Sequence, residues 1–139
     1  MSIPEFFDIS EGYASYRPVK SVSLDEATEM VCNAVSFARE NFIGRLLVNI
    51  TQLTGFDPPT TFERFKMACR VAGDGGIYVK IAVVAKAEFI DPEHFGVVVA
   101  QNLGTRAEIF TAEDEAMAWL MSRKAVRLSS KGGRYTCRH

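Results

Sequence analysis

The chain of 139 residues is poor in cysteine and histidine and has no long apolar run. Its three cysteines lie far apart without a CxxC pair, and there are two histidines, so neither a disulfide framework nor a zinc site is indicated. No apolar run approaches the roughly 20 residues of a membrane helix, and the first residues lack the basic and apolar regions of a secretory signal. We therefore expect a cytoplasmic protein without a metal or other cofactor.

The composition is that of an ordinary folded domain. With 47% hydrophobic residues, 24% charged residues and a formal net charge of -1, the chain is neither disordered nor built as a polyanion binder. Its length fits one domain of common size and excludes a second sizeable one. We place that domain at residues 1–122.

The basic residues are unevenly distributed along the chain. All 17 acidic residues and ten of the 16 Lys and Arg lie in 1–122, which gives this part a formal charge of -7, whereas residues 123–139 carry +6. We interpret 123–139 as a solvated C-terminal tail. The competing hypothesis is recruitment to nucleic acid or to a membrane surface, which predicts salt-sensitive binding that truncation after Ser122 removes. We expect neither nucleic acid nor a membrane to be the partner of this protein.

The apolar periodicity predicts the element order β-β-α-β-α-β-α-β-α. Strands alternating with helices imply parallel pairing through right-handed crossovers, and the opening hairpin adds an antiparallel pair. The fold class is therefore α/β with a single mixed sheet and helices packed on it. The predicted strands are 3–9, 13–19, 45–50, 77–85 and 107–110.

Capping signals mark where the predicted helices begin and end. Capping boxes start two of them, and aspartate- and threonine-type caps start two more; these are Ser23 with Glu26, Thr60 with Glu63, Asp91, and Thr111 with Asp114. Gly73 is expected to stop the second helix and Gly104 to follow the third. The helix faces predicted to be buried include Phe42, Phe62, Phe65, Val98 and Leu103.

The crossover loops 51–60, 86–92 and 110–112 should meet at the edge of the sheet where α/β proteins bind ligands. A helix N-terminus offers partial positive charge and free N–H groups, so this edge is a candidate anion site or phosphorylation switch, with Thr60 or Thr61 as phosphoacceptor. The alternative is that the threonines and aspartates merely cap helices. The candidate ligand- or partner-binding residues are Thr54, Asp57, Thr60, Thr61, Arg64, Asp91 and His94.

A second hypothesis is a small hydrolase or transferase with Asp57, Asp91 and His94 as acid/base groups. Such groups must come within roughly 3 Å of one another or of a shared substrate atom. The sequence has no nucleophile elbow and no phosphate-binding loop, since the glycine-rich stretch 73–76 lacks Lys-Ser/Thr and precedes a strand. We therefore expect no catalytic residues and no enzymatic activity.

Five segments of the chain together form a recognisable pattern: LLVNI at 46–50, LTGFDPP at 53–59, KIAVVA at 80–85, IDPEHFG at 90–96 and IFTAEDEAMAWL at 109–120. In these segments the chain resembles the SpoIIAA-like division of the STAS superfamily, sometimes described as STAS/SEC14-like. The resemblance covers about residues 3–122 and implies a compact sheet with helices, a cytoplasmic bacterial protein and no enzymatic activity.

The best-known STAS members are anti-sigma factor antagonists, in which a partner kinase phosphorylates a serine of an Asp-Ser-Ser-Gly type motif at a helix N-terminus. That motif falls on 57–60 here: Asp57 matches, proline replaces the phosphoacceptor serine and the glycine is absent, which leaves Thr60 or Thr61. Lipid binding as in SEC14 proteins has no motif in this chain. The resemblance thus implies a regulatory domain that engages a protein partner or a small anionic ligand. Whether the chain also forms a homodimer, through an uncovered strand or helix face, is left open by the sequence.

Overall fold

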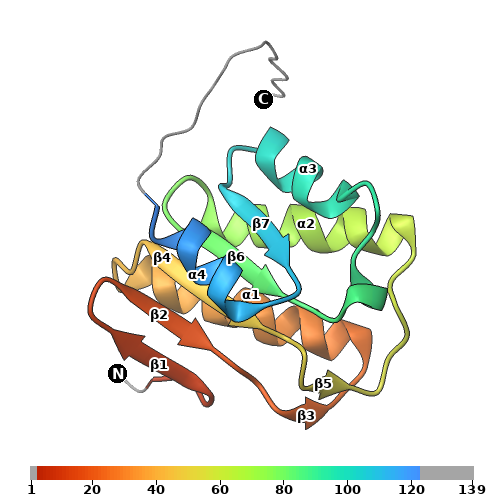
Figure 1. Ribbon diagram of the computed structural model, residues 1–139, viewed down its shortest axis with the longest axis horizontal. Helices are drawn as coiled ribbons and strands as arrows, with labels where there is room; N and C mark the ends of the chain where they lie inside the picture. The colour runs from red at the N-terminus through yellow and green to blue at the C-terminus, as the bar shows by residue number, and fades with distance from the viewer. Residues whose placement is uncertain (1–2, 123–139) are drawn as a thin grey trace.

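The structure is a computed structural model that describes residues 3–122 (Figure 1), and the predictions for the tail 123–139 lie outside these residues. Within residues 3–122 the main sheet has five strands in the order β1-β2-β4-β6-β7. β1 and β2 pair antiparallel and the other neighbours pair parallel, so the predicted α/β fold with a mixed sheet is confirmed. The strands are β1 (Phe7–Ser10), β2 (Tyr13–Tyr16), β4 (Arg45–Asn49), β6 (Lys80–Val84) and β7 (Ala107–Phe110).

A small second sheet was not predicted. β3 (Lys20–Ser21) pairs in parallel with β5 (Leu53–Thr54). Gly55 has a φ of 101°, and a Cβ there would lie 2.5 Å from the carbonyl oxygen of Val22. The close approach of these two chain segments therefore requires glycine at position 55.

Helices cover the main sheet on both faces (Figure 1). The crossovers β2 to β4, β4 to β6 and β6 to β7 all step across the sheet in one direction, so their helices share a face. Strand β4 alternates between the two cores, with Leu46 and Val48 on one side and Leu47 on the other. The shared face carries α1 (Leu24–Glu40), α2 (Thr61–Gly75) and α3 (Phe95–Asn102), and the opposite face carries α4 (Glu113–Leu120).

The two predicted capping boxes are confirmed. The Glu26 amide donates to Ser23 Oγ at 3.1 Å at the start of α1, and the Glu63 amide donates to Thr60 Oγ1 at 3.2 Å at the start of α2. Each glutamate returns the bond by accepting from the backbone N–H of its cap residue, at 3.2 Å in α1 and 2.8 Å in α2. Both helices thus begin with backbone donors satisfied by the chain itself.

The predicted starts of the other two helices are wrong. Residues 91–94 form a turn in which His94 takes a left-handed conformation with a φ of 54°, so α3 begins at Phe95 and not directly after the expected cap Asp91. Ala112, with no side-chain cap, precedes α4 where Thr111 was expected. The acidic residues in the first turn of α4 give favourable charge at its N-terminus in place of a cap.

Several residues predicted to be buried are exposed. Phe42 is 95% exposed because α1 ends at Glu40 and the chain turns through a φ of 60° at Phe42. Phe62 and Phe65 are exposed because α2 turns Ala68 and Ala72 toward the core instead. Val98 of α3 and Leu103, the residue that follows this helix, are also partly exposed. The second helix does not stop at Gly73 but runs to Gly75, whereas Gly104, with a φ of 98°, follows α3 as predicted.

Candidate functional site

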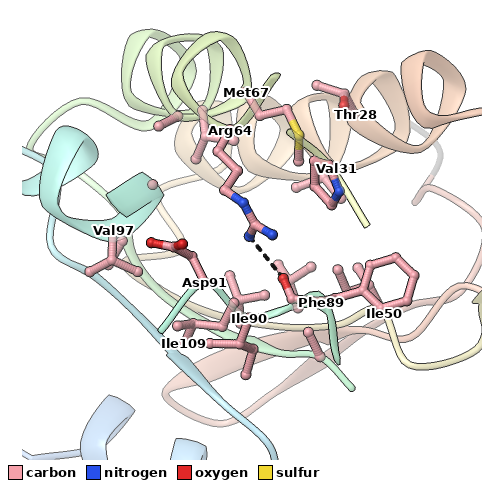
Figure 2. A pocket seen from close by; sticks show the side chains of 18 of the residues that line it. Thr28, Val31, Ile50, Arg64, Met67, Phe89, Ile90, Asp91, Val97 and Ile109 are labelled. Atoms are coloured by element: carbon pink, nitrogen blue, oxygen red, sulfur yellow. Dashed lines mark hydrogen bonds between the residues drawn. The ribbon is translucent and has the colours of Figure 1, made fainter. Parts of the chain in front are cut away.

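A cavity of about 180 Å³ lies between the α1–α3 layer and the sheet (Figure 2). It is lined almost wholly by apolar atoms. Val31 of α1, Met67 of α2, Val97 of α3, Ile50 after β4 and Ile109 of β7 all border it. Protein interiors are ordinarily close-packed, so a half-open apolar cavity of this size between three helices and a sheet is an exception that calls for a functional explanation.

Small residues on facing elements leave this space open. Ala68 of α2, Gly96 and Ala100 of α3, and Ala107 of β7 line the cavity, and three of these four are buried. A Cβ added to Gly96 would meet nothing nearer than 3.8 Å. The cavity therefore results from side chains that are too short to fill the gap between the layers.

Two loops form one end of the cavity. Phe56 lies in the loop between β5 and α2, and Phe89 ends the short 3-10 helix η1 (Ala87–Phe89) after β6. Their rings meet edge to face with centroids 5.6 Å apart. Because both segments are loops at the carboxyl ends of parallel strands, this end of the cavity lies at the edge where α/β sheets bind ligands.

Arg64, in the first turns of α2, points its guanidinium into the cavity (Figure 2). Its Nη1 donates to the carbonyl oxygen of Phe89 at 2.9 Å. Within residues 3–122 Arg64 forms no salt bridge and its side chain makes no other hydrogen bond. A guanidinium has five N–H donors in a planar fork, so most of them are free for a ligand.

The two acidic residues that line the cavity are engaged elsewhere. The Asp91 carboxylate accepts from the backbone N–H of Phe95 at 2.9 Å, which satisfies the N-terminus of α3. Glu108 Oε1 lies 3.7 Å from His94 Nδ1 and also accepts from the amide of Ile109 at 3.3 Å. In the described part of the chain Arg64 is therefore left without a carboxylate partner, although two acids line the same cavity.

The structure gathers three of the seven predicted site residues at this cavity, namely Arg64, Asp91 and His94. The other four are exposed and, in the described part of the chain, are not among the cavity-lining residues; they are Thr54, Asp57, Thr60 and Thr61. Thr60 acts as the cap of α2, and the Glu63 carboxylate already occupies that N-terminus. The acid/base group of the enzyme hypothesis is likewise divided, since Asp91 accepts from the backbone of Phe95, His94 Nδ1 lies 3.7 Å from Glu108, and Asp57 does not line the cavity.

Sequence reasoning missed the cavity itself and its neighbour Glu108. The available signal was the run of small residues on the inner faces of α2 and α3, such as Ala68 and Ala100, which indicates faces that fill little volume. Within residues 3–122, no group of three or more His, Cys, Asp or Glu side chains is arranged to hold a metal ion. No helix in that same range combines the length and apolar character needed to cross a membrane.

No family model, no curated protein and no solved structure matches the chain.

Proposed function

We propose that this protein is a non-enzymatic binding domain whose cavity holds a small, mainly apolar molecule. The observation that carries the proposal is the apolar cavity of about 180 Å³ beneath helices α1–α3. By comparison with an engineered apolar cavity of about 150 Å³ that stays dry and binds benzene, it takes roughly six to eight carbon atoms. Filling it returns to the lining side chains the contacts that an empty cavity forfeits.

The proposal keeps the expected binding role and moves the ligand from the exposed loops to the interior. At the exposed edge the chain supplies its own anions, with Glu63 at the start of α2 and Asp91 at the start of α3. An external anion at either helix start would have to displace one of them. Membership of the STAS superfamily, a regulatory protein partner, phosphorylation of Thr60 or Thr61 and a cytoplasmic location stay predictions beside this proposal.

A series of n-alkanols tests the cavity without involving charge. From hexanol upward, each added methylene should lower the dissociation constant about fourfold, until the chain outgrows the cavity and the gain stops. The measurement is isothermal titration calorimetry, supported by the ligand-induced rise in Tm. If no alkanol binds, the cavity does not serve a small apolar ligand.

A cavity-filling variant supplies the matched test. Ala100→Leu places three additional carbons among the buried cavity-lining residues and should weaken alkanol binding at least tenfold while leaving the fold intact. Ala118→Leu makes the same change on α4, at an exposed position on the other face of the sheet, and should leave binding unchanged. Equal affinities of the two variants would contradict the proposal.

A further inference from the structure

We propose that the molecule held in the cavity is a short- to medium-chain monocarboxylate whose carboxylate binds Arg64. This inference rests on the proposed function and adds the chemistry of the ligand's polar end. Arg64 carries it because its guanidinium points into the apolar cavity (Figure 2) and, among residues 3–122, has a single acceptor, the Phe89 carbonyl oxygen.

The donor geometry favours a carboxylate. Donors that stay unpaired beside an apolar lining cost free energy, so the free N–H groups of Arg64 favour an occupant that brings acceptors. A carboxylate matches the planar guanidinium fork with two parallel N–H···O bonds. A hydroxyl group offers one oxygen and no charge, and leaves most of the fork unpaired.

The surrounding charges favour a single negative charge over two. Asp91 and Glu108 line the same cavity; one oxygen of Asp91 accepts from the N-terminus of α3, and one oxygen of Glu108 accepts from the amide of Ile109. One added negative charge pairs with Arg64. A second negative charge, as on a phosphate monoester, would find no further Lys or Arg among the cavity-lining residues of the described chain and would be repelled by the carboxylates of Asp91 and Glu108. The cavity thus selects a monoanion.

The size of the cavity limits the length of the ligand's hydrocarbon chain. Space for roughly six to eight carbon atoms suits a chain near octanoate and is too small for a two-chain lipid. The side chains that would surround the hydrocarbon come from every layer of this half of the fold, among them Val31, Met67 and Ile109. A free monocarboxylate therefore fits both the polar end and the apolar remainder.

The experiment compares octanoate, 1-octanol and octyl phosphate on the full chain by isothermal titration calorimetry at pH 7. Octanoate should bind at least tenfold more tightly than 1-octanol, the range expected for hydrogen bonds to a charged group, and more tightly than octyl phosphate. Equal binding of acid and alcohol would overturn the carboxylate assignment while leaving the proposed function in place. Tighter binding of octyl phosphate would assign the site to a phosphate. Failure of all three ligands would instead remove the proposed function.

Variants of Arg64 locate the carboxylate. Arg64→Gln should weaken the binding of octanoate at least tenfold and that of 1-octanol less than threefold. Arg64→Lys keeps the positive charge but loses the planar fork of donors, so its affinity for octanoate should lie between those of Arg64→Gln and the wild type. Arg70→Gln on the same helix is the matched control, since Arg70 is exposed and pairs with Glu29. An equal loss for octanoate and 1-octanol in both Arg64 variants would show that Arg64 only supports the shape of the cavity.

Discussion

Arg17 and Glu113 form a two-point ion pair across the carboxyl edge of the main sheet, with Nε–Oε2 at 2.7 Å and Nη2–Oε1 at 3.0 Å. Asn49, the last residue of β4, donates to the same Oε2 at 2.7 Å. Arg17 also donates through Nη1 to the buried Ser15 of β2 at 2.8 Å. One carboxylate thus fixes the start of α4 to the ends of β2 and β4.

This pairing predicts a pH-dependent stability. The Arg17 hydrogen bond, and with it the Asn49 amide, lowers the pKa of Glu113 below the ordinary 4.5 of a glutamate. When folding lowers the pKa of a carboxyl group, the ionised group stabilises the folded state. This contribution is complete at pH values above the pKa of the unfolded chain, and it is lost as pH falls through the lower pKa of the folded state. Glu113→Gln should therefore lower the free energy of unfolding at pH 7, by at most about 1 kcal/mol because the pair is partly exposed to solvent.

Urea unfolding of wild type and Glu113→Gln between pH 7 and pH 3 measures this contribution. The difference between the two proteins should shrink as pH falls below about 4.5, because the unfolded chain then binds a proton at Glu113 that the folded state binds only at lower pH. Glu115→Gln is the control: it removes one negative charge from the first turn of α4 at an exposed position and leaves the ion pair of Glu113 intact. A gap of constant size at pH 3 and pH 7 would show that the ion pair contributes nothing that depends on charge.

Lys80, a buried residue of β6, stabilises the other end of α4. Its Nζ donates to the carbonyl oxygens of Trp119 at 2.8 Å and Ser122 at 3.0 Å, and it lies 4.5 Å from the centroid of the Trp119 ring. The last carbonyls of a helix have no partner within it and carry partial negative charge. A cation reaching out of the sheet thus ends α4 where the chain has no capping glycine.

Lys80→Met keeps the apolar stem and removes the donors, so it should lower the free energy of unfolding by about 1–3 kcal/mol. Lys20→Met is the matched control, because Lys20 is an exposed residue of the short strand β3. Both are compared with wild type by urea unfolding at pH 7. Should the two variants lose the same stability, the contacts of Lys80 with α4 add nothing beyond those of a surface lysine.

The sequence predicted those parts of the fold that depend on neighbouring residues. A capping box needs a residue and the glutamate three positions later, and both boxes formed as expected. The nearly continuous apolar run at 45–50 became the central strand β4, buried on both faces. The pairing of β3 with β5 escaped prediction because two-residue strands have no periodicity and form only where distant segments meet.

Burial was predicted less well, because periodicity identifies residues that share a helix face but not how much of that face is covered. Phe62 and Phe65 share a helical stripe, yet the contacts of α2 with its neighbours centre on Ala68 and Ala72. The same limit hid the cavity, since an unfilled volume depends on side chains from several elements at once. Arg64 and His94 could be placed near the ligand-binding edge from the sequence, but not beside an apolar interior.

Thr60 and Thr61 stand next to each other and should respond differently to substitution. Thr60 Oγ1 accepts from the Glu63 amide at 3.2 Å, and the Glu63 carboxylate accepts from the Thr60 amide at 2.8 Å. Thr60→Ala removes the cap and should cost about 1 kcal/mol of unfolding free energy, whereas Thr60→Ser should retain it. Thr61→Ala, at an exposed position of the first turn, serves as the control and should change stability little. Urea unfolding at pH 7 compares the three; equal losses for Thr60→Ala and Thr61→Ala would mean that the capping box contributes no stability of its own.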